Sequence, residues 1–166
     1  MAKGYSNVSY FRGGIPEWRY FNYPLTVGEK WQKVKVAKLP PRECRKMLKE
    51  NNDIFLLDAR SLDNGTLSRE DLVFTMDNAL LAGDYIKGAL HCPLVFLEEN
   101  LALIPKDRKI IVTDWIMKES IIAAKFLAMH GYEVLGILKG GTSRWQTEGL
   151  PLVHGQSGAD RQLACQ

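Results

Sequence analysis

Three thiols and two carboxylates are the side chains with the clearest capacity for covalent or acid–base chemistry in this chain. They are Cys44, Cys92, Cys165, Asp114 and Glu119. Cysteine supplies a soft nucleophile that accepts a sulfur atom, whereas paired carboxylates bind a cation or assist a hydrolysis. The cysteines are an odd, sparse set without CxxC spacing, so they indicate neither a disulfide framework nor a zinc site. The sequence therefore predicts no metal and no cofactor.

Each thiol also has a structural interpretation. Cys44 lies on the apolar face of a predicted helix, which favours a buried core position. Cys92 follows His91 and invites a Cys/His pairing, but neighbours on a strand point to opposite faces, so core packing is favoured for Cys92. Cys165 belongs to the polar end of the chain, where nothing organises its pKa. Cys92 and Cys165 remain the alternative thiols for a chain that does transfer sulfur.

The elements that must position these groups alternate along the chain. Helices are predicted at about 41–51, 69–82, 96–101, 121–130 and 142–147. Strands are predicted at 34–36, 54–57, 88–92, 110–113 and 134–138. Strands separated by helices predict an α/β fold with a mainly parallel five-stranded sheet and helices on both faces. Ligand sites in such sheets gather at the carboxyl ends of the strands.

Polar residues stand at two of those ends. The apolar run 54–57 is followed by Asp58 and Arg60, and the run 110–113 is followed by Asp114. We expect Asp58 and Arg60 to bond backbone groups and to fix a loop, and a pairing of Arg60 with Asp114 or Glu119 stays open.

One helix is predicted to close that loop. Ser120 is expected to cap a helix over 121–130, which Gly131 terminates. Within this helix we expect Ile122, Phe126 and Met129 to form the inward stripe.

Two stretches of the chain are versions of each other. Seven identities in 25 aligned positions recur 127 positions later: Gly4-Tyr5, Gly13-Gly14, Trp18 and Pro24-Leu25 match Gly131-Tyr132, Gly140-Gly141, Trp145 and Pro151-Leu152. Self-similarity at a fixed offset without a gap indicates a repeated structural unit. We therefore expect residues 1–25 to be the end of one unit, with upstream sequence missing, and a complete unit to follow.

Composition describes an ordinary globular chain. Its 166 residues are 46% hydrophobic and 25% charged, enough for one domain with a full core. Formal net charge is +3, with 22 basic and 19 acidic residues, which does not favour a nucleic-acid or membrane surface. No long apolar run or signal-peptide pattern is present, so no membrane span is expected and the cytoplasm is the default compartment.

The order of these motifs resembles the rhodanese-like domain family of sulfurtransferases. The likeness covers roughly 33–152, from the strand ending in Asp58 and Arg60 to the closing Gly140-Gly141, Trp145 and Gly149-Leu150-Pro151. The resemblance implies a rhodanese-like domain over 33–153, with 154–166 as a flexible tail. It also implies that 1–25 closes a preceding rhodanese-like unit, so that the complete unit is the C-terminal one of a tandem protein.

The resemblance further implies where sulfur chemistry belongs. Active members carry Cys-x-x-Gly-x-Arg-Ser on the loop after the fourth strand, where backbone N–H groups surround the thiolate and its persulfide. The loop here has Asp114, Trp115, Ile116, Met117, Lys118, Glu119 and Ser120 at those positions. Asp114 takes the place of the cysteine, Met117 that of the glycine and Glu119 that of the arginine. A carboxylate does not accept sulfane sulfur, so the resemblance predicts a vestigial site and a binding, regulatory or structural module.

Several alternatives stay open. Asp114 either accepts backbone hydrogen bonds, holds a cation with Glu119, belongs to a carboxylate-based hydrolase, or helps to form a recognition surface. The longer connection 61–84, compared with the family, either covers the altered loop or packs as a surface helix. Active transfer by another cysteine, or by an upstream unit, is the alternative to a silent module.

Partner binding is expected from exposed apolar surface. Residues 1–25 carry too many aromatic side chains to stay solvated, so we expect them to pack on the main domain or on a partner chain, as in a homodimer. The apolar loop Trp115 to Met117 is a second docking candidate.

Overall fold

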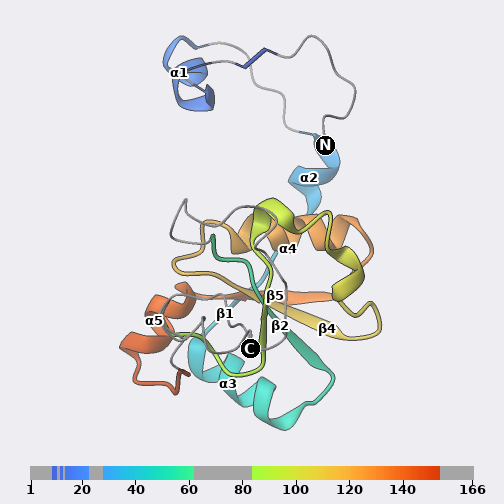
Figure 1. The fold of residues 1–166 in the computed structure, drawn as a ribbon, viewed down its shortest axis with the longest axis vertical. Coiled ribbons are helices and arrows are strands. Elements are labelled where there is room, and N and C mark those ends of the chain that lie inside the picture. Colours follow the sequence, from blue (N-terminus) through green and yellow to red (C-terminus); the bar gives the residue numbers. More distant parts are fainter. Residues whose placement is uncertain (1–8, 11, 13, 23–27, 62–83, 154–166) are drawn as a thin grey trace, which may run out of the picture.

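A five-stranded parallel sheet forms the centre of the computed structural model, which describes residues 9–10, 12, 14–22, 28–61 and 84–153 (Figure 1). The strands are β1 (Lys38–Leu39), β2 (Ile54–Asp58), β3 (Ala89–His91), β4 (Lys109–Thr113) and β5 (Val134–Leu138). Their order across the sheet is β1-β5-β4-β2-β3, and all four neighbouring pairs are parallel. The predicted fold class is therefore confirmed.

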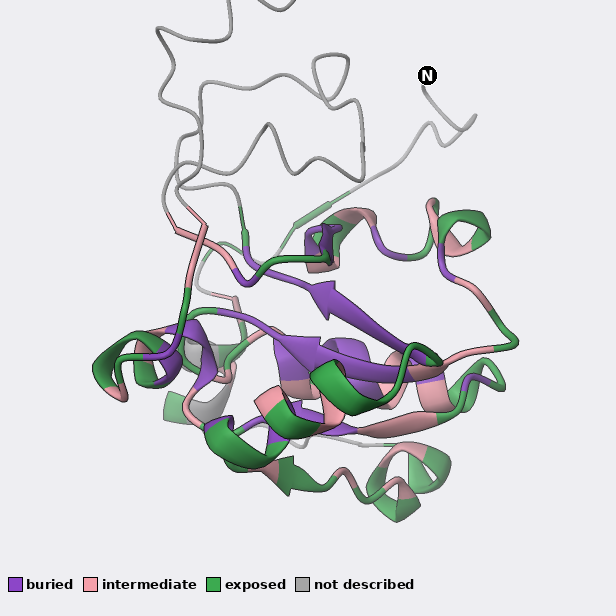
Figure 2. Ribbon diagram, turned by 90° about the horizontal axis from the view of Figure 1, so that it is seen from below, coloured by how far each residue is buried: buried purple, intermediate pink, exposed green. Residues whose placement is uncertain are grey.

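Continuous apolar runs form the inner strands because both faces of the sheet are covered. Every residue of β2 is buried, as are four of the five residues of β4. Alternate side chains enter two separate cores: Phe55 and Leu57 lie in one cluster, whereas Ile54 and Leu56 lie in the other. Figure 2 shows the inner strands as the buried layer between exposed helices.

Helices cover the sheet on both sides. The helix α4 (Ser120–Met129) packs on one face with the short 3-10 turns η2 (Leu94–Phe96) and η3 (Leu101–Leu103). The helices α3 (Pro41–Glu50) and α5 (Gly141–Thr147) cover the other face (Figure 1). Two further helices precede the sheet, α1 (Gly14–Tyr20) and α2 (Glu29–Lys33), and Lys125 of α4 donates to the Trp31 carbonyl of α2 at 3.1 Å.

Two predicted elements differ from the structure. The expected strand 34–36 is replaced by β1 at Lys38–Leu39, because the bonds to β5 run from Ile137 N–H to the Ala37 carbonyl and from Lys139 N–H to the Leu39 carbonyl. Pairing with a neighbouring strand, and not local alternation, decides where an edge strand lies. The expected helix 96–101 is wrong, since two 3-10 turns flank that stretch instead.

The inward face of α4 also differs from the prediction. Its buried residues are Ser120, Ala123, Ala124 and Leu127. Ile122 and Met129 of the expected stripe are 43% and 46% exposed, and Phe126 is partly buried. Small alanines face the sheet, so the helix lies close to it and its larger side chains are left at the margins. Gly131 does end the helix, with φ of +80°.

Several predictions fall on residues outside the described ranges. These are the helix 69–82 within the connection 61–84, the tail 154–166 with Cys165, and much of the segment 1–25. Among the described residues, no helix is both long and apolar enough to cross a membrane.

Candidate functional site

The loop between β4 and α4 is organised around a buried carboxylate. Asp114 follows the last residue of β4 and is 0% exposed. Its Oδ1 accepts the Met117 N–H at 2.6 Å, while its Oδ2 accepts the N–H groups of Glu119 at 2.7 Å and Ser120 at 3.0 Å. Three backbone donors therefore converge on one side chain at the start of a helix.

This arrangement is electrostatically favourable. A carboxylate at a helix N-terminus faces the positive end of the helix dipole and satisfies N–H groups that have no partner within the helix. Ser120, predicted as the cap, makes no capping bond, and its Oγ is buried without a hydrogen-bond partner. Asp114 takes over the capping role from outside the helix. Of the interpretations left open for Asp114, the hydrogen-bonding one agrees with these contacts.

The main chain of the loop is held by the start of α5. The Asp114 carbonyl accepts the Thr142 N–H at 2.7 Å and the Thr142 Oγ1 at 3.0 Å, and the Trp115 carbonyl accepts the Ser143 N–H at 3.1 Å. Gly141 makes this approach possible, because a Cβ there would lie 2.6 Å from the Asp114 carbonyl oxygen and nearer still to the Trp115 carbonyl. Gly141 thus lets the start of α5 hold the loop in place.

Met117 has a backbone conformation that is usual for glycine. Its φ is +68°, one of two positive values at non-glycine residues in the described part of the chain. A side chain in this region costs roughly 1–2 kcal/mol relative to the right-handed one. The turn is therefore held by the carboxylate of Asp114, with the Met117 side chain packed partly against the core.

The rest of the loop faces outward. Trp115 and Ile116 are each 46% exposed, whereas Met117 is partly buried, so the apolar tripeptide divides between surface and core. Lys118 is exposed, and the Glu119 carboxylate accepts the Ser61 hydroxyl at a long 3.5 Å. The two carboxylates of the loop thus have different partners.

Asp58 and Arg60 form a buried clamp beside the loop. The Arg60 guanidinium reaches both Asp58 carboxylate oxygens, with Nε at 3.0 and 2.9 Å and one terminal nitrogen at 2.7 Å. Its other terminal nitrogen donates to the Asp84 carbonyl at 3.0 Å. Asp58 is therefore the ionic partner of Arg60, in place of the Asp114 or Glu119 pairing that the sequence left open. The clamp joins the end of β2 to the chain that enters β3.

His91 belongs to the same buried group. Its Nε2 lies 2.8 Å from the Arg60 carbonyl oxygen. Burial lowers the pKa of His91, while the Arg60 carbonyl and the Asp58 carboxylate partly oppose that shift. The imidazole is thus held in its neutral form at the carboxyl edge of the sheet.

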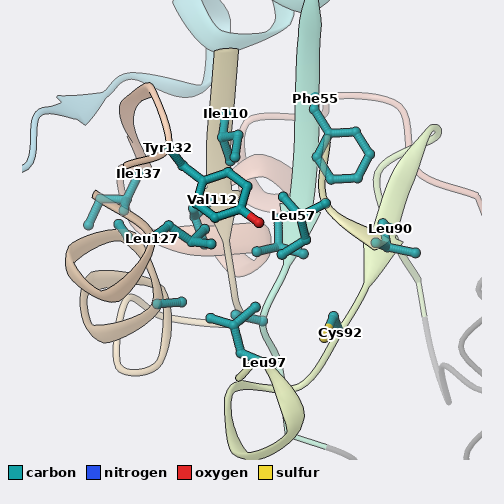
Figure 3. Close-up of a cluster of buried hydrophobic side chains, with 14 residues drawn as sticks. Phe55, Leu57, Leu90, Cys92, Leu97, Ile110, Val112, Leu127, Tyr132 and Ile137 are labelled. Carbon is teal, nitrogen blue, oxygen red and sulfur yellow. The ribbon is translucent and has the colours of Figure 1, made fainter. Parts of the chain in front are cut away.

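The described thiols lie in the core. Cys92 is 0% exposed and belongs to an apolar cluster that also contains Leu90 and Leu97 (Figure 3). Burial raises the pKa of Cys92 to about 11 and, with the Glu43 charge as a smaller contribution, that of Cys44 to about 12. Neither thiol receives the N–H groups that converge on Asp114. Cys165 lies outside the described residues.

Metal-binding geometry is absent from the part of the chain that the structure describes, where no three His, Cys, Asp or Glu side chains gather. Asp114 directs both carboxylate oxygens at N–H groups, which would compete with a cation.

Sequence reasoning missed two contributors to the site. His91 was considered only as a neighbour of Cys92, whereas its bond goes to Arg60. Thr142 and its bonds to the Asp114 carbonyl were also missed. The Gly140-Gly141 pair was the available signal, because adjacent glycines often mark a close backbone approach.

Comparisons with known proteins agree with this architecture. A family model described as the rhodanese-like domain matches residues 40–148. A protein of Allochromatium vinosum named "Sulfurtransferase" is 31% identical over 99 residues, which cover 58% of this chain and 92% of that protein.

Solved structures share the fold. A rhodanese-related protein from Thermoplasma volcanium aligns with a TM-score of 0.53 and 20% identity over 70% of this chain and 96% of that one. A rhodanese-like domain protein from Staphylococcus aureus aligns with a TM-score of 0.52 and 20% identity over 72% and 98%, respectively.

Proposed function

The chain belongs to the rhodanese-like domain family, and from that premise we propose that its domain is a binding, regulatory or structural module whose sulfur-carrying position is filled by Asp114. The supporting observation is the carboxylate that accepts the N–H groups of Met117, Glu119 and Ser120. In active members of the family, such a ring of amides surrounds a cysteine thiolate and then the persulfide formed on it. Here the side chain of Asp114 takes the place of the anion.

The chemistry of sulfur transfer requires a thiolate. A cysteine thiolate attacks the sulfane sulfur of thiosulfate, an S–S bond forms on the protein, and the S–S bond of the donor breaks to release sulfite. A carboxylate oxygen offers no equivalent soft nucleophile. Asp114 therefore leaves the covalent step without a carrier, while its hydrogen bonds preserve the shape of the loop.

The charge of the loop also opposes sulfur transfer. The family form has an arginine at the position of Glu119, and a guanidinium attracts an anionic donor. Glu119 replaces that cation with an anion, partly exposed beside Ser61. Two carboxylates within six residues oppose the approach of thiosulfate.

The alternative function is sulfur transfer by another thiol. The relative named "Sulfurtransferase" supports this alternative. Cys92 is poorly suited, because burial holds its thiol protonated and inaccessible. Cys165 is the other candidate within this chain, and a unit upstream of this one is the candidate outside it.

A persulfide assay tests the proposal. The chain is incubated with thiosulfate, and the mass of the intact protein is followed for the addition of one sulfur atom. We expect no addition above a control without donor. A gain of one sulfur atom on the native chain, lost in Cys165→Ser, would contradict a silent module and assign the transfer to that thiol.

Variants of the loop give the matched positive arm. Asp114→Cys restores the carrier, and the triple variant that adds Met117→Gly and Glu119→Arg restores the rest of the family pattern. We expect thiosulfate-dependent persulfide in the triple variant, with Asp114→Ser in the same background as the inactive control. Failure of the triple variant, with its fold intact, would show that the loop is not a retained sulfur cradle.

We also propose that the module acts through protein contacts. Trp115 and Ile116 present apolar surface beside the altered loop, and residues 1–25 are the second candidate surface, toward a partner protein or a second copy of the chain. Self-association through the loop is tested by light scattering of the chain and of Trp115→Ser, whose substitution we expect to lower the mean mass if this surface joins two copies.

A further inference from the structure

The N-terminal helix repeats the backbone of the closing helix. The helices α1 (Gly14–Tyr20) and α5 (Gly141–Thr147) both have seven residues, and they begin and end 127 positions apart. Gly14 and Gly141 have φ of +58° and +62°. The offset of 127 positions found in the sequence identities therefore also relates the two helices to each other. It relates the positive φ angles of their first residues as well.

A second backbone feature follows the same offset. Asn22 has φ of +54°, and Gly149, 127 positions later, has φ of +67°. Asn22 and Met117 are the two non-glycine residues with positive φ in the described part of the chain. Asparagine tolerates this conformation better than most residues. Helix start, helix end and the turn beyond the helix are thus all repeated.

The complete copy shows what this backbone is for. Around α5, the positive φ and missing Cβ of Gly141 let the helix start approach the Asp114 and Trp115 carbonyls. Trp145 is 2% exposed, and its Nε1 donates to the Pro151 carbonyl at 3.0 Å. Closing a rhodanese-like unit is therefore the work of this segment.

In this chain α1 has a different environment. Figure 1 shows it apart from the sheet and its covering helices. Ile15, which corresponds to the fully buried Thr142, is 55% exposed. Tyr20 and Phe21 at the end of the helix are 80% and 51% exposed, with their rings in an edge contact at 5.2 Å. Ile15, Tyr20 and Phe21 thus leave apolar surface exposed on α1 and just beyond its end.

We infer that residues 13–24 are a closing segment. Their partner is the body of a second rhodanese-like unit that has no closing segment of its own in the position that α5 occupies here. The corresponding position on this domain is taken by α5, which contacts the Asp114 loop through Thr142 and Ser143. A second copy of this chain has the same position filled. The partner that fits is therefore a different rhodanese-like domain. On the loop before its fourth helix, two backbone carbonyl groups would be free to accept hydrogen bonds from the closing segment.

The inference is independent of whether Asp114 silences sulfur transfer, because it concerns the surface that closes a unit. It requires that residues 13–24 can perform the task of residues 140–151. The two stretches have equal length and share both glycines, the tryptophan and the proline. Pro16 takes the place of Ser143 in the first helical turn, where proline is well tolerated.

A graft in the full-length chain tests this requirement. Residues 140–151 are replaced by a copy of residues 13–24, and unfolding by heat and by urea is followed together with the amide spectrum. We expect a single cooperative transition, with the thermal midpoint lowered by on the order of 10 °C because eight side chains change. The matched control carries the same twelve residues in scrambled order, with the glycines displaced, and should lose the cooperative transition.

A second graft distinguishes a segment that cannot close the domain from a misfit confined to the first helical turn. It keeps Thr142 and Ser143, with their bonds to the loop, and takes only residues 17–24 in place of 144–151. Cooperative unfolding of either graft, abolished by Gly141→Ala within it, supports the inference. If both grafts unfold like the scrambled control, or if the scrambled control folds as well as they do, the inference is overturned. None of these readouts depends on sulfur transfer.

Discussion

At the level of single residues, the Asp114 carboxylate organises the loop between β4 and α4. The three amide groups that converge on it need an anion or another hydrogen-bond acceptor. The carboxylate supplies this acceptor as a side chain of the protein itself. We propose that Asp114 replaces the nucleophile of active family members and permanently fills the site where they hold an exchangeable anion.

Removing this carboxylate should destabilise the domain. In Asp114→Ala three backbone donors lose their acceptor, and we expect a loss of on the order of 3–5 kcal/mol in the free energy of unfolding. Asp114→Asn keeps the shape but turns an NH2 group toward the donors, so about 1–3 kcal/mol should be lost. Urea unfolding measures both, with Asp107→Ala at an exposed turn as the control. Equal stabilities of Asp114→Ala and the control would show that the bonds contribute nothing.

His91 gives the domain a pH dependence. Because burial lowers its pKa in the folded state, the unfolded chain takes up a proton first as the pH falls. The associated stability is complete above the unfolded pKa of about 6.5 and decreases below it, until the folded pKa is passed, by at most about 1.4 kcal/mol per pH unit. Urea unfolding at pH 7.5, 6.5 and 5.5 should show this fall.

A variant identifies the group responsible. In His91→Gln we expect a lower stability at pH 7.5 and a flatter profile toward acid pH, since the titrating imidazole is gone. The exposed His130→Gln is the control and should retain the profile of the native chain. A native profile in His91→Gln would assign the effect to another group.

At the scale of elements, the contact between α5 and the loop fixes the site. Gly141→Ala should be much more damaging than Gly131→Ala, although both glycines have positive φ. A Cβ at Gly131 has no atom within 4 Å, so only the backbone penalty of roughly 1–2 kcal/mol applies. At Gly141 the Cβ would meet two carbonyl groups that cannot move aside, which adds about 1–3 kcal/mol.

Urea unfolding of the two glycine variants provides the measurement, and the difference between them is the informative quantity. Chemical shifts of the Thr142 and Ser143 amides should move in Gly141→Ala and stay in place in Gly131→Ala, because only the first variant separates the helix from the loop. Equal losses in both variants would mean that the close approach is not a constraint.

Element positions follow the sequence where the pattern is strong and depart from it where packing decides. The apolar runs of β2 and β4 and the glycine that ends α4 are predicted correctly, because they express burial on two faces and a positive φ. The face of α4 is predicted incorrectly. Ala123 and Ala124 carry little hydrophobic signal, yet close packing on the sheet selects them over Ile122 and Met129.

At the scale of the whole molecule, the two cores are built without the N-terminal helix. Neither cluster includes a described residue from 9–22. We therefore expect removal of residues 1–27 to change the free energy of unfolding by less than about 1 kcal/mol. Removal of residues 1–33 should cost more, because it also deletes α2 and the contact of Trp31 with Lys125.

Urea unfolding of the full and shortened chains distinguishes two arrangements of the segment. An unchanged stability agrees with a segment that serves a partner unit. A loss of several kcal/mol on removing residues 1–27 would instead show that they pack on their own domain, the other arrangement that the sequence predicted.

Patterns in the sequence are enough to predict the family, the parallel sheet and the acidic residue on the loop before α4. These features reside in local order: apolar runs, glycines at fixed spacing and the residue type at one position. Tertiary structure alone decided that the Asp114 carboxylate collects three amides, that Arg60 pairs with Asp58, and that α5 fixes the loop. Those contacts join groups brought together by chain folding and by side-chain geometry, which the order of residues does not express.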